Sequence, residues 1–153
     1  MERNMKKFFI AIMSVMLMST LLYSADKSAK QYIADLDPAK DEAVIVAAAD
    51  WCGKEKEKGA ISSLTALCTD SREAVRLHAV MALGYIGKED AVDALNKRLL
   101  TDESAEVRYA AVLATVRIGS KKSLEAWKEA KEKENDPFIK DFLVKMEEKA
   151  RGK

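Results

Sequence analysis

The sequence predicts an all-α protein: a right-handed α-solenoid of stacked antiparallel helix pairs, with about three to four repeats. The first observation is an internal repeat, because the segment Asp70–Gly87 (DSREAVRLHAVMALGYIG) returns thirty-two residues later as Asp102–Gly119 (DESAEVRYAAVLATVRIG). The second is that apolar residues recur three or four positions apart, both within these segments and between them, which gives each predicted helix one apolar face. No such helix can bury its face alone, so a fixed period of this size is typical of stacked helical repeats.

The first twenty-five residues have the layout of a secretory signal peptide. Met1–Lys7 is basic, Phe8–Leu22 is an uncharged apolar run, and Ser24 and Ala25 are small. The run is short for a membrane span, which needs about twenty apolar residues. We therefore expect residues 1–25 to be removed and the protein to be exported to the periplasm or cell envelope, with no membrane span after processing. The alternative is a retained N-terminal anchor.

Residues 26–153 are expected to form one repeat domain, with units at about 37–68, 69–100 and 101–133 and a partial capping unit at 134–150. The predicted helices cover 28–36, 39–52, 60–68, 72–86, 89–100, 104–118, 121–133 and 137–150. Asp37-Pro38 and Asp136-Pro137 are expected to open helices, because proline at the first helical position loses no hydrogen bond. Gly87 and Gly119 are expected to end helices in the left-handed conformation.

An aspartate and an arginine stand six residues apart in each echo, as Asp70 and Arg76 and again as Asp102 and Arg108. We expect each aspartate to lie in a turn and cap the next helix. Each arginine would then lie on the first turn of that helix and reach the aspartate of an adjacent unit. The predicted result is a structural ladder of charge-assisted hydrogen bonds along the stack.

The pattern A-V-x-x-L-x-x-x-L-L-x-D, followed by V-R-x-x-A-x-x-A-L-G-x-I-G, resembles the short HEAT-like repeats named after phycobilisome lyases. The resemblance covers roughly residues 37–150. It implies a helical-repeat fold whose inner, concave helices carry the Val-Arg pair, and it is nearly silent on function. Attachment of a bilin chromophore is an alternative that rests on fold analogy alone.

The composition argues against an enzyme and against several classes of ligand. The single histidine, His78, has no second ligand at metal-binding spacing, and neither a Ser/His/Asp set nor a Gly-rich phosphate loop is present. We therefore expect no catalytic residue, no cofactor and no metal. The 26 Lys and Arg against 25 Asp and Glu provide no basic footprint for nucleic acid.

The two cysteines, Cys52 and Cys68, are not expected to form a disulfide. They would lie at opposite ends of an antiparallel helix pair, on the order of 14 Å apart, which exceeds the span of a disulfide. Cys68 is predicted to be a core residue. Cys52 aligns with Gly84 and is predicted to be partly accessible.

An apolar stripe follows the predicted inner helices, at the positions one, five and nine after each arginine. Its residues are Ile45, Ala49, Leu77, Met81, Tyr85, Tyr109, Leu113 and Arg117. We expect the stripe to bind a protein or peptide partner, so that the chain is a non-enzymatic interaction module or scaffold of the periplasm or cell envelope. Two alternatives leave the stripe buried: the segment Asp26–Leu36 folds over it, or two copies form a homodimer through it. A structural subunit of an envelope complex is a further alternative function.

Overall fold

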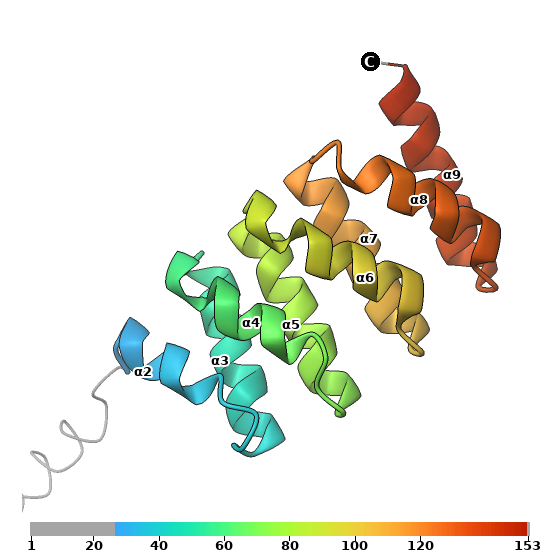
Figure 1. Ribbon diagram of the computed structural model, residues 1–153. Helices are drawn as coiled ribbons and strands as arrows, with labels where there is room; N and C mark the ends of the chain where they lie inside the picture. Colours follow the sequence, from blue (N-terminus) through green and yellow to red (C-terminus); the bar gives the residue numbers. More distant parts are fainter. Residues whose placement is uncertain (1–26, 153) are drawn as a thin grey trace, which may run out of the picture.

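The computed structural model describes residues 27–152, and within them the chain is a helical solenoid without strands (Figure 1). The α-helices are α2 (Ala29–Asp35), α3 (Glu42–Lys54), α4 (Ile61–Leu67), α5 (Glu73–Ile86), α6 (Val92–Thr101), α7 (Ala105–Ile118), α8 (Ser123–Lys133) and α9 (Pro137–Arg151). Two short 3-10 turns, η1 (Lys58–Ala60) and η2 (Glu89–Ala91), lead into α4 and α6. The predicted α-solenoid is confirmed. The predicted signal peptide, residues 1–25, lies outside the described residues.

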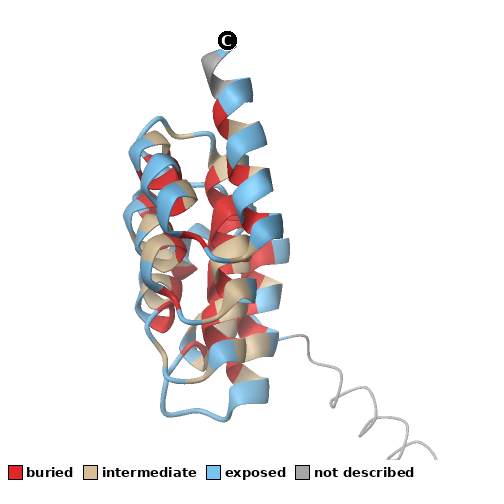
Figure 2. Ribbon diagram, turned by 90° about the vertical axis from the view of Figure 1, so that its right-hand side faces the viewer, coloured by how far each residue is buried: buried red, intermediate tan, exposed pale blue. Residues whose placement is uncertain are grey.

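The helices form two layers with the core between them (Figure 2). The shorter helices α2, α4, α6 and α8 make one layer, and the longer helices α3, α5, α7 and α9 make the other. Each long helix packs against the short helix before it and against the long helices beside it. The packed pair is therefore a short helix followed by a long one, so units that start at 37, 69 and 101 place the two members of a pair in different units.

The apolar periodicity of the sequence marks the core correctly in the central repeats. Val75, Ala79 and Leu83 of α5 are buried, and so are Leu95 and Leu99 of α6. These residues recur at three- and four-residue spacing, so each helix turns one continuous apolar face toward the opposite layer.

Two glycines allow neighbouring long helices to pack with their backbones in close contact. A Cβ atom at Gly53 would lie 2.9 Å from the Cα of Ala82, and one at Gly84 would lie 2.7 Å from the Cβ of Ala114. Gly53 of α3 is thus the structural equivalent of Gly84 of α5, and the step between them is thirty-one residues instead of thirty-two. Since one residue turns a helix by about 100°, this shift changes which side chains of α3 face the core.

The helix ends agree with the sequence prediction at three of four places. Gly87 and Gly119 end α5 and α7 in the left-handed conformation, each with a φ of 71°. Asp136 caps α9, because its carboxylate accepts the backbone N–H groups of Phe138 and Ile139.

The prediction that Asp37-Pro38 opens a helix is wrong. These residues lie in a turn, and α3 begins at Glu42. The Asp37 carboxylate accepts the N–H of Ala39, and the Arg72 guanidinium donates to the backbone carbonyls of Pro38 and Lys40. These hydrogen bonds hold the segment in a turn and occupy carbonyls that a helix starting at Pro38 would use itself.

Candidate functional site

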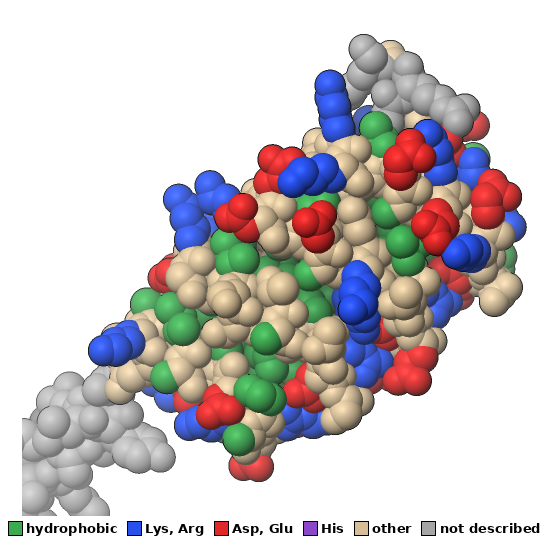
Figure 3. All heavy atoms as spheres, in the orientation of Figure 1, with side chains coloured by type: hydrophobic (Ala, Val, Ile, Leu, Met, Phe, Trp, Pro, Cys, Tyr) green, Lys and Arg blue, Asp and Glu red, His purple; other side chains and the backbone are tan. Residues whose placement is uncertain are grey.

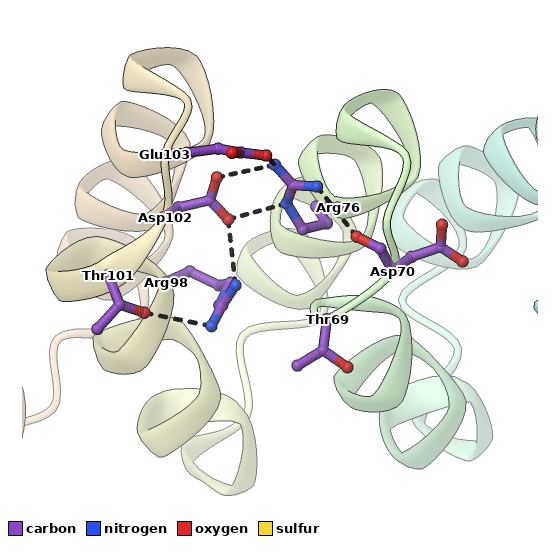
Figure 4. A pocket seen from close by; sticks show the side chains of 7 residues that line it. All are labelled: Thr69, Asp70, Arg76, Arg98, Thr101, Asp102 and Glu103. Atoms are coloured by element: carbon purple, nitrogen blue, oxygen red, sulfur yellow. Dashed lines mark hydrogen bonds and ion pairs between the residues drawn. The ribbon is translucent and has the colours of Figure 1, made fainter.

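The charged pairs lie along the edge of the stack where the long helices begin (Figure 4). Arg76, on the first turn of α5, donates from Nε to Oδ2 of Asp102 at 3.0 Å and from Nη2 to Oδ1 at 3.1 Å. Asp102 follows the last residue of α6, so the pair joins two neighbouring units, and both residues are buried. Nη1 of Arg76 also donates to the carbonyls of Asp70 and Ser71, which fixes the loop before α5.

The next rung uses a glutamate where the repeat has an aspartate. Arg108 of α7 donates from Nε and Nη2 to the two carboxylate oxygens of Glu134, each at 2.8 Å. The carboxylate also accepts the backbone N–H groups of Asn135 and Asp136. The hydrogen bonds from Arg108, with those backbone groups in support, hold the pKa of Glu134 below its usual value. Arg108 therefore fastens α7 to the loop that precedes α9.

Asp70 has no arginine from the unit before it, because Ile45 stands where α3 would carry one in the thirty-one-residue register. Its carboxylate instead pairs with Arg72, at 2.8 Å to both Nε and Nη2, and these bonds lower the pKa of Asp70.

The expectation that Asp70 and Asp102 cap the next helices is also wrong. Each accepts a backbone N–H two residues ahead, from Arg72 and Ser104 respectively. Arg72 and Ser104 are themselves the N-cap residues of α5 and α7.

A polar cavity of about 230 Å³ opens beside the first rung. The two arginines that line it, Arg76 and Arg98, both donate to Asp102, and Arg76 also reaches Glu103. Because these guanidinium groups already have carboxylate partners, their chemistry here is that of a structural joint between units.

The second candidate site is an apolar groove between α5 and α7, with a volume of about 280 Å³. We refer to it as the α5–α7 groove. It is lined by Leu77, Met81, Gly84 and Tyr85 of α5 and by Glu106, Tyr109, Ala110, Leu113, Ala114 and Arg117 of α7. Six of the eight residues of the predicted stripe thus come together in one place. Gly84 and Ala114 are in close contact within this lining.

The placement of Ile45 and Ala49 in the stripe is wrong, because both are buried in the core. The thirty-one-residue step explains this: Val46 and Asp50 are the equivalents of Leu77 and Met81, and Ile45 is turned inward. The same shift buries Cys52, which was aligned with Gly84 and predicted to be partly accessible.

Aromatic side chains extend the apolar surface from the α5–α7 groove onto α9. The Arg117 guanidinium lies 4.4 Å from the centre of the Tyr85 ring, and the Tyr109 ring packs against Phe138 and Phe142 at 5.2 and 5.7 Å. Phe138, Tyr85 and Leu113 expose 63%, 43% and 41% of their surface. The two phenylalanines were missed, because Asp141 and Lys145 were taken to close the stripe on this helix. The sequence signal that could have predicted them is the presence of two aromatic residues, four positions apart, near the start of the last helix.

The N-terminal segment does not cover the α5–α7 groove over the residues that the structure describes. α2 packs against α3, where the Tyr32 ring stacks on Trp51 with centroids 4.2 Å apart. Tyr85 and Leu113 remain exposed. The alternative in which Asp26–Leu36 folds over the stripe is therefore contradicted from Ala29 to Leu36.

The opposite face, formed by the short helices, has a different character. Among the described side chains on the face that Figure 3 shows, Lys and Arg are interspersed with Asp and Glu around apolar areas. Such a surface has no extended field of one sign.

The described residues contain no group of three or more His, Cys, Asp or Glu side chains placed to hold a metal ion. Nδ1 of His78 lies 2.6 Å from Oδ1 of Asp50, which links α5 to α3 at the surface. Both cysteines are free thiols in the core, and burial raises the pKa of Cys52 to about 11 and that of Cys68 to about 12. Between Lys27 and Gly152, no helix combines the length and the apolar character needed to cross a membrane.

Comparison with known protein families identifies the type of repeat. A profile described as HEAT repeats matches residues 31–115 and, in a second match, residues 61–142. Together the two matches run from α2 into α9 and include both the charged ladder and the α5–α7 groove. A search of curated proteins returns no match to the chain.

Proposed function

Since the chain belongs to the HEAT-repeat family, we propose that it is a non-enzymatic interaction module that binds a protein partner on its long-helix layer. The observation that carries the proposal is the α5–α7 groove, where Tyr85 and Leu113 are exposed to solvent around an apolar hollow. A contiguous exposed apolar patch of this kind usually marks an interaction site.

The lining of the groove supports a protein partner over a small metabolite. Eight of the ten residues that line it are uncharged, Glu106 and Arg117 being the exceptions, and the groove is open to solvent. Met81 adapts its shape easily, while Tyr85 and Tyr109 combine apolar area with a hydroxyl group. These are the residue types that are enriched in protein interfaces.

The cellular setting is the periplasm or cell envelope, and the support for it is the basic, apolar and small-residue order of residues 1–25. The repeats would be of the short phycobilisome-lyase-like type, on the strength of the sequence pattern quoted above. The alternative role as a structural subunit of an envelope complex uses the same surface. Chromophore attachment has no specific observation in its favour among the described residues.

A site-specific cross-link in intact cells tests the proposal. A photoreactive amino acid at Leu113 should form a covalent adduct with a partner that mass spectrometry identifies. The same group at Lys97, an exposed residue of α6 in the other layer, is the matched control and should form none.

Exposed side chains of the groove supply the second arm of this experiment. With the photoreactive group kept at Leu113, Tyr85→Ser should leave the melting temperature nearly unchanged, because Tyr85 is exposed, and the adduct should be lost. Val144→Ser, at an exposed residue of α9 outside the groove, should retain the adduct. Equal adduct formation from Leu113 and Lys97 would refute the groove as the interaction site.

A further inference from the structure

The layer of long helices carries charged residues at both edges and exposed apolar residues between them. α5 and α7 run in the same direction, because Arg76 near the start of α5 bonds to Asp102 just before α7, while Gly84 near the end of α5 meets Ala114. α3 runs in that direction too (Figure 1), and Gly53 near its end meets Ala82 in the second half of α5. The first turns of these helices carry Glu42, Glu73 and Glu106. The last turns carry Lys54 on α3 and Arg117 on α7, and that of α5 carries no basic residue. The edge where these helices begin is therefore acidic, and the edge where they end is basic at α3 and α7.

We propose that this face pairs with the same face of a second copy of the chain, in antiparallel orientation about a two-fold axis. The inference rests on the proposed function and names the partner of the α5–α7 groove. A two-fold dimer uses the same patch on both subunits, so the patch must complement itself. Antiparallel pairing places the acidic edge of each copy against the basic edge of the other, and the exposed apolar residues then meet in the middle.

The shape of the surface fits this arrangement. Each copy offers a hollow, the α5–α7 groove, and a projecting side chain, Phe138, beside it. Phe138 lies against Tyr109, so it extends the exposed apolar surface beside the groove of its own chain. A parallel arrangement would bring Glu106 to Glu106 and Arg117 to Arg117, which disfavours it.

The alternative occupants explain fewer of these observations. Helix dipoles favour acidic first turns and basic last turns, which accounts for the signs at the two edges. The helix dipoles do not account for the exposure of Tyr85, Leu113 and Phe138 between those edges. α2, which was expected to cover the stripe, is engaged with α3.

Charge reversal on the full chain tests the proposal by sedimentation equilibrium at low salt. The wild type is expected to be a dimer. Arg117→Glu and Glu106→Arg should each raise the dimer dissociation constant at least about tenfold, because each places like charges together at both ends of the interface. An equimolar mixture of the two variants should recover the dimer as a heterodimer, because both charge contacts are then attractive again.

Two further variants make the result specific. Leu113→Ser should also give a monomer, and Lys97→Glu on α6 is the matched control and should remain a dimer. Thermal melting of each variant checks that the fold is retained. A wild type that stays monomeric at millimolar concentration, a dimer that ignores both reversals, or a mixture that stays monomeric would each overturn the proposal.

The two proposals can fail separately. If the wild type is monomeric but the Leu113 cross-link still captures a different protein, the second copy is the wrong partner and the interaction surface stands. If the wild type is a dimer and the cross-link captures its own chain, both are supported.

Discussion

Replacing Arg108 by alanine removes a whole rung of the ladder, and its cost can be estimated from the contacts. The guanidinium makes two bonds of 2.8 Å to Glu134 and one of 3.1 Å to each of the carbonyls of Asp102 and Glu103. The Glu134 side chain is only 3% exposed, whereas that of Arg108 is 18% exposed. A lost charge-assisted bond with a buried partner costs about 1.5–3 kcal/mol, and breaking a fully buried pair costs about 3–5 kcal/mol. Because water can enter beside Arg108 and Glu134 keeps two backbone donors, we expect a loss of about 2–3 kcal/mol.

Urea unfolding followed by circular dichroism measures this loss, and thermal melting supports it. For a domain of this size the melting temperature should fall by about 6–12 °C. Arg108→Lys should recover part of the stability, because lysine keeps the charge but cannot form the two-pronged contact. Arg76→Ala should cost more, since the side chains of Arg76 and Asp102 are 6% and 1% exposed. An unchanged free energy of unfolding for Arg108→Ala would show that the rung does not hold the units together.

The pH dependence of the same variant gives an independent check. The pKa of Glu134 lies below its ordinary value of 4.5 in the folded protein, chiefly because Arg108 donates to its carboxylate. The stability that this ionised carboxylate contributes is therefore fully present above about pH 4.5 and is lost as the pH falls through the lower folded pKa. The difference in unfolding free energy between wild type and Arg108→Ala should narrow in that acidic range. A difference that stays constant from neutral pH to pH 3 would contradict the assignment.

Three other predictions follow from particular residues. Gly84→Val should destabilise the fold by about 2–3 kcal/mol in urea unfolding, because even its Cβ would lie 2.7 Å from that of Ala114; Gly119→Ala, which meets no atom within 4 Å and strains only the backbone, should cost about 1 kcal/mol. Cys52 and Cys68, whose pKa values are raised to about 11 and about 12 by burial, should react slowly with a disulfide reagent at pH 8 and rapidly in denaturant; a fast native reaction of either thiol would argue against a closed core. N-terminal sequencing of protein from cells should begin between about Ala25 and Lys27, and an intact Met1 in the membrane fraction would contradict removal of residues 1–25.

The fold was predictable because the repeat signals are local. Helical spacing of Val75, Ala79 and Leu83 gives the buried face of α5, and Gly87 marks where that helix ends. The turn at Asp37-Pro38 was not predictable from the same rules, because its shape depends on Arg72, more than thirty residues later in the chain. A hydrogen bond to a residue so far along the chain cannot be predicted from the sequence of the turn alone.

The candidate site was predictable where the repeat period is regular. Leu77, Met81 and Tyr85 were placed correctly because α5 and α7 share the Val-Arg pair, which sets the register between them. α3 has no such pair, so a step of thirty-two residues assigned Ile45 to the surface when it lies in the core. Reading small residues as close-contact points would have aligned Gly53 with Gly84 and avoided the error.

The two tryptophans of the chain lie in different environments at opposite ends of the solenoid. Trp51 of α3 is partly exposed and stacked on Tyr32, whereas Trp127 of α8 is buried and donates from Nε1 to Oγ1 of Thr115 at 2.9 Å. Their fluorescence spectra should therefore differ in wavelength, with Trp127 emitting further to the blue. In a stack where each unit contacts only its neighbours, the ends can unravel at different denaturant concentrations. Single-tryptophan variants would thus work as two built-in optical reporters, one for each end, and would reveal whether the array melts all at once or from one end first.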